Sequence, residues 1–189
     1  MINKSEFSQI REEMHKTDLK RENVIQTSRE IITLSKQIIY AAQRNELSAA
    51  QEALKSIKEK IRKLKKVDII TDTNIHAVAF QEYVEAIAFY EFTRSGKIPT
   101  KKSLGVSAED YLSGLADLTG ELGRKAIYDV IHKRFGEAEK IKELVHEIYG
   151  EFLKLHLRNG ELRKKADAIK WNLKKLEEVM YDIAIHKKQ

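Results

Sequence analysis

The chain has 189 residues, 34% of them charged and 42% hydrophobic, with a net charge of +6, a composition typical of one folded domain over residues 1–189. It has no Cys, which excludes disulfides and thiolate metal sites, and its single Pro and 8 Gly favour long helices. No stretch approaches the roughly 20 apolar residues that cross a bilayer, and the N-terminus lacks the apolar run of a signal peptide, so we expect a soluble cytoplasmic protein without a membrane partner.

The first strong pattern is an apolar seam with spacings of three and four residues, which predicts a core-facing helix of about six turns. The seam consists of Val24, Ser28, Ile31, Ser35, Ile38 and Ala42. A second apolar row beside it consists of Ile25, Ile32 and Ile39.

Two further helices follow in the first half of the chain. Asn45 is the expected cap of the second helix. The apolar seam of that helix consists of Leu47, Ala50, Leu54, Ile57, Ile61 and Leu64. Asp72, Thr73 and Asn74 offer the cap of the third helix, which is expected to stop near Ser95. Residues 96–106 then form the one long loop that the sequence predicts.

The second half predicts three more helices. Ser107, with Asp110 three residues later, has the pattern of a capping box and opens a helix that runs to about Arg134. Gly136 separates this helix from the next. The last two seams are Ala138, Ile141, Val145, Ile148, Phe152 and Leu155, and then Leu162, Ala166, Ile169, Leu173, Leu176, Met180 and Ile183. No alternating strand pattern occurs, so the sequence predicts an all-α bundle of six or seven long, near-antiparallel helices.

The third helix carries two acids within its apolar stripe. Glu82 and Glu85 lie between Val78 and Phe89 on one face. A buried pair of like charges is costly unless a cation or hydrogen-bond donors neutralise it. Because this helix is apolar nearly all round, an exposed stripe is the alternative. The core face would then consist of Ala79, Tyr83, Ala86 and Tyr90.

A second acidic pair, Asp117 and Glu121, lies on one face of the following helix. Its small face of Ala116, Gly120 and Gly123 is expected to let another backbone approach closely. Carboxylate oxygens from two helices suit Mg²⁺ or Mn²⁺, and such a cation can activate water and stabilise charge on a phosphoryl group. The four acids therefore indicate metal-assisted phosphodiester cleavage, although acidic pairs of this spacing also occur on solvated helices.

The acidic motifs also carry a family resemblance. The sequences "QEYVEAIAFYEF" (residues 81–92) and "DYLSGLADLTGELGRKAI" (residues 110–127) resemble the translin superfamily, in particular the branch of translin-associated factor X, or Trax. The sequence "RENVIQTSREIITLSKQIIYAAQR" (residues 21–44) is similar to the first long helix of Trax. Residues 155–186 are more similar to translin itself, and this combination resembles the single-gene forms found in archaea.

The resemblance implies a seven-helix bundle that assembles into closed homo-oligomers, usually octamers. It also implies an endoribonuclease that needs Mg²⁺ or Mn²⁺ and cleaves single-stranded RNA, with Glu82, Glu85 and Asp117 as catalytic residues and metal ligands. Glu121 is then a fourth metal ligand. The alternative is a non-catalytic module that binds single-stranded RNA or DNA, as translin does. Because translin lacks the first Glu pair, that pair favours the nuclease.

Basic residues near the acids are candidates for nucleic-acid contacts. Arg21, Arg29 and Lys36 share roughly one face of the first long helix, and Arg124 follows the second acidic pair by one turn.

Glu143 and His146 form a single E-x-x-H pattern. Di-iron helical bundles need two such patterns, so a ferritin-like oxidase is the weaker alternative.

Overall fold

The computed structural model describes residues 2–67 and 74–186 of the chain. These residues form seven helices and no strand, which confirms the predicted all-α bundle. The helices are α1 (Lys4–Gln43), α2 (Gln51–Leu64), α3 (Ile75–Ser95), α4 (Lys101–Leu104), α5 (Ala108–Ile131), α6 (Phe135–Leu153) and α7 (Glu161–His186). No helix in this described part is both long enough and apolar enough to span a membrane.

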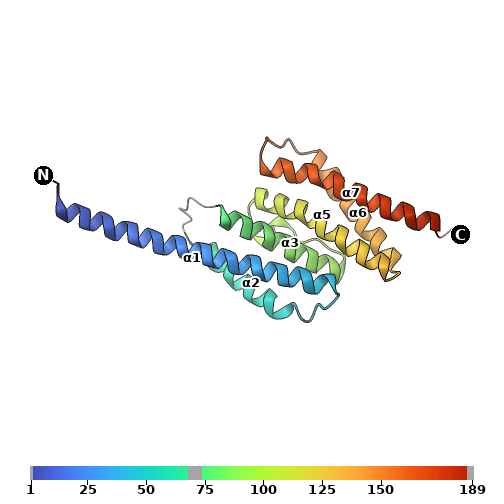
Figure 1. The fold of residues 1–189 in the computed structure, drawn as a ribbon, viewed down its shortest axis with the longest axis horizontal. Coiled ribbons are helices and arrows are strands. Elements are labelled where there is room, and N and C mark those ends of the chain that lie inside the picture. Colours follow the sequence, from blue (N-terminus) through green and yellow to red (C-terminus); the bar gives the residue numbers. More distant parts are fainter. Residues whose placement is uncertain (1, 68–73, 187–189) are drawn as a thin grey trace.

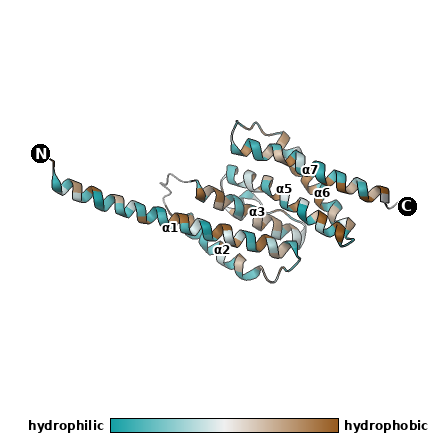
Figure 2. Cartoon of the chain, in the orientation of Figure 1, coloured by the Kyte–Doolittle hydropathy of each residue, from teal (hydrophilic) through white to brown (hydrophobic). Residues whose placement is uncertain are grey.

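Helix α3 lies in the middle of the bundle, packed between α1 and α5 (Figure 1). Helix α2 folds back along α1, whereas α6 and α7 pack against α5 (Figure 1). Every residue from position 83 to position 90 of α3 is buried, and Figure 2 shows hydrophobic residues along this central helix. The two acidic pairs are therefore carried by neighbouring helices, and the first pair lies on the most enclosed helix of the bundle.

Helix α1 contains the predicted seam but is much longer than the seam. All six seam residues are buried, as the spacing predicted. Residues 4–20, which we call the N-terminal arm, are all exposed and project from the bundle (Figure 1). Phe7, Ile10 and Met14 form an exposed apolar row along the arm. The arm was not predicted because three apolar residues among many charged ones make a weak helical pattern.

Several helix ends follow from local chemistry. The Ser107 hydroxyl accepts a hydrogen bond from the Asp110 backbone N–H at 3.0 Å and donates one to the Asp110 carboxylate at 2.7 Å, at the predicted start of α5. Gly96 ends α3 with a φ of 70°, in the left-handed region that Gly adopts without strain. The predicted long loop is interrupted by α4, whose first turn is capped by the Thr100 hydroxyl.

Two predicted caps in the first half of the chain were not found. Helix α2 begins at Gln51 and not directly after Asn45, which has a φ of 61° and so lacks the extended backbone of an N-cap. Asn74 precedes α3 but makes no side-chain capping hydrogen bond. Asp72 and Thr73 lie outside the described residues.

The boundary between α5 and α6 was also placed wrongly. The break lies at Lys133, which has a φ of 61°, and Gly136 is already inside α6. Arg134 follows the break and binds the buried carboxylate of Asp129 at 2.6 Å, and Lys125 binds the same carboxylate at 2.9 Å. This buried ion-pair network fixes the turn at a position that local propensity did not reveal.

The close approach between helices occurs at a different glycine from those predicted. A Cβ at Gly120 would make only an ordinary contact at 3.7 Å, and one at Gly123 would meet nothing within 4 Å. A Cβ at Gly114 would lie 2.6 Å from the Gln81 carbonyl oxygen and 2.7 Å from the Val84 Cβ. Gly114 therefore sets the spacing between α5 and α3, the two helices that carry the acids.

The substitution Gly114→Ala is expected to lower the free energy of unfolding by about 1–3 kcal/mol, because the added methyl group overlaps the backbone of α3. Helix propensity alone would favour Ala by about 1 kcal/mol, so the sign of the change separates packing from propensity. Urea unfolding measures the difference. Gly123→Ala, where space is open, is the matched control and is expected to be neutral or stabilising. A Gly114→Ala chain as stable as the unmodified one would contradict the close approach.

Candidate metal centre

The structure brings the four predicted acids together at the α3–α5 interface. Glu85 is buried, with 8% of its surface exposed, and Glu82, Asp117 and Glu121 are half-buried. The alternative is wrong in making the whole acidic stripe of α3 exposed, because Glu85 and Phe89 are buried, although Val78 is exposed. Its core face is confirmed, because the four residues of that face are buried: Ala79, Tyr83, Ala86 and Tyr90. Helix α3 is enclosed on both faces because it lies between α1 and α5.

The carboxyl groups of α3 are held away from water and lack a direct counter-ion. Burial, followed by the negative charges of Asp117, Glu82 and Glu121, raises the pKa of Glu85 to about 8, against an opposing effect of Lys165. Burial also raises the pKa of Glu82. Within the described residues, neither Glu82 nor Glu85 makes a direct hydrogen bond or ion pair. At neutral pH the Glu85 carboxyl group of the metal-free chain is mostly protonated.

The two acids of α5 are neutralised by side chains from other parts of the bundle. Asp117 forms an ion pair with Lys165 of α7. Glu121 accepts hydrogen bonds from Gln43 of α1 and, at 3.0 Å, from Arg124 of its own helix. The cluster therefore divides into two acids with partners and two acids whose charge is unmatched by a direct partner.

A cavity of about 280 Å³ opens beside the acids. Glu82, Glu85 and Glu121 line it from α3 and α5. The opposite wall is a single face of α1, at positions i, i+3, i+4 and i+7, made of Lys36, Ile39, Tyr40 and Gln43. Asp117 does not line this cavity, because its carboxylate is engaged by α7.

The chemistry of these side chains fits a hard divalent cation. All four ligand groups are carboxylates, the type of ligand that Mg²⁺ and Mn²⁺ prefer, and two of them have no direct partner. In residues 2–67 and 74–186, however, no three acidic or His side chains already form a group that could hold a metal. Both carboxylate oxygens of Glu121 accept hydrogen bonds and one oxygen of Asp117 does, so Glu82, Glu85, Asp117 and Glu121 could hold the cation only after a local rearrangement.

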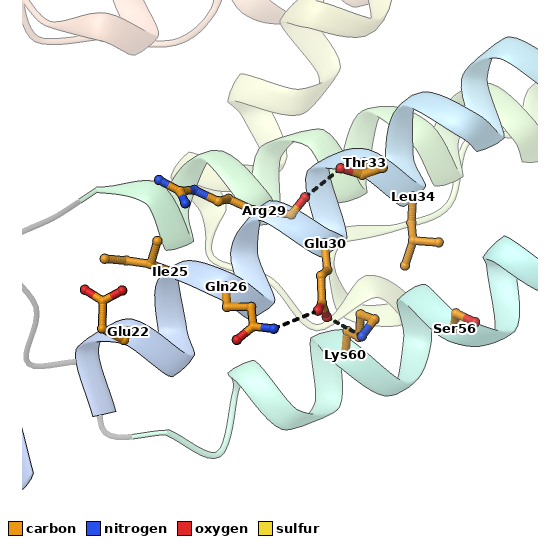
Figure 3. Close-up of a pocket in the computed structure, with 9 residues that line it drawn as sticks. All are labelled: Glu22, Ile25, Gln26, Arg29, Glu30, Thr33, Leu34, Ser56 and Lys60. Carbon is orange, nitrogen blue, oxygen red and sulfur yellow. Dashed lines mark hydrogen bonds and ion pairs between the residues drawn. The ribbon is translucent and has the colours of Figure 1, made fainter. Parts of the chain in front are cut away.

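Two of the predicted nucleic-acid-binding residues lie beside the acids. Lys36 and Arg124 line the acidic cavity. Arg29 lies two turns before Lys36 on α1 and lines a different groove of about 620 Å³, between α1 and α2 (Figure 3). In that groove Glu30 forms an ion pair with Lys60 of α2, and Arg29 points away from this pair (Figure 3).

Two other predicted features lie apart from the acids. Arg21, nearer the N-terminus of α1, lies 3.0 Å from the Glu22 carboxylate, and it does not line the acidic cavity. Glu143 and His146 of α6 are both exposed. Since the described residues contain no group of three ligands, the E-x-x-H pattern is not part of a di-iron site in this structure.

Sequence reasoning missed Lys165 and Gln43, which bind the acids of α5. Lys165 follows Leu162 by three residues and precedes Ile169 by four, so it lies at the edge of the buried face of α7. Gln43 follows Lys36 by seven residues and shares its helix face. These spacings were available, but the sequence does not show which helices face one another.

The fold and the site define this chain as an all-α bundle protein with a carboxylate cluster between two inner helices. Its sequence matches the model of the Translin family over residues 19–187, and the chain belongs to that family.

The similar proteins include translins and a translin-associated protein X. Translin of Bos taurus is 30% identical over 198 residues, which cover 93% of this chain and 86% of that protein. Translin of Gallus gallus is 36% identical over 85 residues, but these cover 45% of this chain and only 37% of that protein. Translin-associated protein X of Pongo abelii is 25% identical over 224 residues, covering 95% and 77%. The family is thus shown, and the branch within it stays a prediction.

Solved structures agree with this fold. The crystal structure of apo-NeC3PO superposes with a TM-score of 0.82 at 31% identity, covering 91% of this chain and 94% of that one. The structure of AfC3PO in its complex with duplex RNA gives a TM-score of 0.81 at 27% identity, covering 95% and 97%. The predicted translin-like architecture is therefore confirmed.

Proposed function

We propose that this chain is a Trax-like endoribonuclease that depends on Mg²⁺ or Mn²⁺ and cleaves single-stranded RNA. The observation that carries the proposal is the buried Glu85 carboxyl group, with three further carboxylates around it on neighbouring helices. Such a cluster of like charges opposes folding unless something neutralises it. A divalent cation is the ligand that these oxygens suit best.

In this proposal the carboxylates of Glu82, Glu85 and Asp117 hold the cation, and Glu121 supports it from the next turn of α5. Once bound, the cation supplies a more acidic water and neutralises charge on the phosphate. Lys36 and Arg124 line the same cavity and bind the phosphates of the strand. The chain's own part is thus to fix the acids on two packed helices and to hold the strand against them.

We expect single-stranded RNA to be the preferred substrate. The cavity beside the acids is small, about 280 Å³, and an unpaired strand can bend and expose its bases to such a site. AfC3PO, which shares this fold, has been solved with duplex RNA, so RNA is a ligand of a similar protein. We expect this chain to bind single-stranded RNA more tightly than duplex RNA, and the affinity to fall steeply as salt rises.

Incubation of labelled single-stranded RNA with the chain tests the proposal. Cleavage is expected with Mg²⁺ or Mn²⁺ and none with EDTA. The second candidate is a non-catalytic module that binds single-stranded RNA or DNA, and the lack of a ready-made group of three ligands in the described residues favours it. Salt-sensitive binding without cleavage in either metal would establish this second candidate and overturn the nuclease.

The proposal includes assembly of about six to eight chains into a closed homo-oligomer, with the octamer expected from the family resemblance. Trp171, Tyr181 and Ile185 support it, because they are 61%, 66% and 42% exposed on one side of α7. Light scattering after size exclusion is expected to give a multiple of 21.9 kDa in this range. A monomer at micromolar concentration would contradict the assembly.

A further inference from the structure

Lys165 of α7 reaches into the acidic cluster but does not line the cavity. Its ammonium group donates to the Asp117 carboxylate and, at 2.9 Å, to the side-chain oxygen of Gln81. The Lys165 and Asp117 side chains are 28% and 35% exposed, so the pair is largely sheltered from water. The Lys165 ammonium group therefore links α7 to α3 and α5, the two helices that carry the acids.

The neighbouring basic residues of α7 make different contacts. Lys164 pairs with Glu161 in its own helix, and these two side chains are 74% and 80% exposed. Arg163 pairs with Asp167, again within α7. Successive helix residues differ in direction by about 100°, so of these three basic residues it is Lys165 that faces α5. Its contact with Asp117 is a feature of the packing of α7 on α5 and not of a generally basic helix.

The charge of Lys165 acts on the whole cluster. It neutralises Asp117 directly, and it opposes the rise in pKa of both Glu82 and Glu85. This is part of the electrostatic effect that a divalent cation would have at the same place. The Lys165 ammonium group lies on Oδ2 of Asp117, and it would repel a metal ion that approached the same carboxylate. Lys165 therefore engages one of the two oxygens that Asp117 could offer a metal and weakens the attraction of the other.

We propose that Lys165 is a positioning residue that competes with the divalent cation for Asp117, holding this carboxylate in the metal-free chain and releasing it when the cation binds. The inference rests on the proposed function, because it takes the acids as metal ligands. Its geometric basis is the ion pair between Lys165 of α7 and Asp117 of α5.

The substitution Lys165→Met tests the competition, because it keeps the length of the side chain and removes its charge. The full chain with this change is expected to bind Mn²⁺ about three- to tenfold more tightly in isothermal titration calorimetry, a factor that corresponds to the loss of one partly exposed ion pair. Lys164→Met makes the same charge change one residue away and is expected to leave the affinity unchanged within about twofold. Lys165→Arg keeps the charge and is expected to stay close to the unmodified affinity.

A double substitution makes the test specific to Asp117. In an Asp117→Asn chain the carboxylate is already gone, so adding Lys165→Met is expected to give a clearly smaller gain in Mn²⁺ affinity than in the unmodified chain, because only the longer-range effect of Lys165 on Glu82 and Glu85 remains. Circular dichroism confirms that each variant is folded, and should Lys165→Met fail to fold, the competition is judged by Lys165→Gln in the same assay.

The outcomes separate this inference from the proposed function. Unchanged or weaker Mn²⁺ binding by the folded, uncharged variant would overturn the competition, even if the unmodified chain cleaves RNA. If the Lys165→Met variant binds Mn²⁺ more tightly but the unmodified chain never cleaves RNA, the competition is supported and the nuclease proposal is overturned. If neither the unmodified chain nor the variant binds Mn²⁺ at millimolar concentration, both proposals fall.

Discussion

A chain carrying Glu85→Gln is expected to lose RNA cleavage by a factor on the order of a hundred or more, while its affinity for RNA stays within a few fold. Gln keeps the shape of the Glu side chain but removes the charge that the divalent cation needs. Initial cleavage rates at saturating Mg²⁺ and filter binding in EDTA measure the two quantities separately.

The other acids give a graded series. Glu82→Gln and Asp117→Asn are expected to reduce cleavage as strongly as the Glu85 variant. Glu121→Gln is expected to cause a smaller loss, because two donors already bind its carboxylate in the metal-free chain. Glu139→Gln, at an exposed position of α6, is the matched control and should cleave normally. Unmodified rates for all three strong variants would show that the metal site is assigned to the wrong residues.

The free energy of unfolding of the metal-free chain is expected to decrease as the pH rises from about 4.5 to about 8. The folded chain holds the pKa of Glu85 at about 8, above its ordinary value of 4.5, so between these values the folded state binds one more proton than the unfolded state. The contribution of Glu85 to the free energy of unfolding is complete below its unfolded pKa of 4.5 and is lost as the pH rises through its folded pKa of about 8. Its size is on the order of 3 kcal/mol, because one pKa unit corresponds to about 1.4 kcal/mol and a small part of the group meets solvent.

Glu85→Gln removes this titration and isolates its effect. The Gln side chain is neutral at every pH, so in EDTA the free energy of unfolding of the variant is expected to rise relative to that of the unmodified chain as the pH increases. At pH 8.5 the variant is expected to be more stable by about 1 kcal/mol or more. Guanidinium unfolding at pH 5.5, 7.0 and 8.5 measures the difference, with Glu139→Gln as the exposed control. Parallel stability curves for the two chains would show that Glu85 does not carry the raised pKa.

Most helix seams were predictable from local sequence, because burial on a helix repeats every three to four residues. The seams were wrong at their ends, since Leu155 is exposed beyond the end of α6, and Leu47 and Ala50 precede α2. Helix ends were predictable where one side chain or one glycine determines them, as at Ser107 and Gly96. They were missed where non-glycine residues adopt a positive φ, as at Asn45 and Lys133. At both positions the next backbone N–H closes the end of the helix, from Glu46 to the Ala41 carbonyl and from Arg134 to the Asp129 carbonyl. Glycine is the usual residue in this motif, so a sequence without glycine there gave no signal.

The acids were predictable for the same local reason, since Glu82 and Glu85 share one face of a single helix. Lys165 was not predictable, because its pairing with Asp117 depends on how α7 packs against α5. The position of the close helix contact was predicted wrongly for the same reason. Glycines were visible in the sequence, but the position of α3 over Gly114 decides which of them is needed.

The N-terminal arm has a mechanical consequence for the molecule. The arm continues the buried part of α1, but all of its own residues are exposed. Its helical structure therefore depends on the buried part of α1, and we expect its N-terminal turns to open most easily. Opening of this end is a local event that costs far less than global unfolding. Bending, cutting or capturing the arm therefore leaves the separation of α3 and α5 unchanged, because Gly114 and the core seams set that separation independently. The arm and the carboxylate cluster therefore lie in one chain with little mechanical coupling between them.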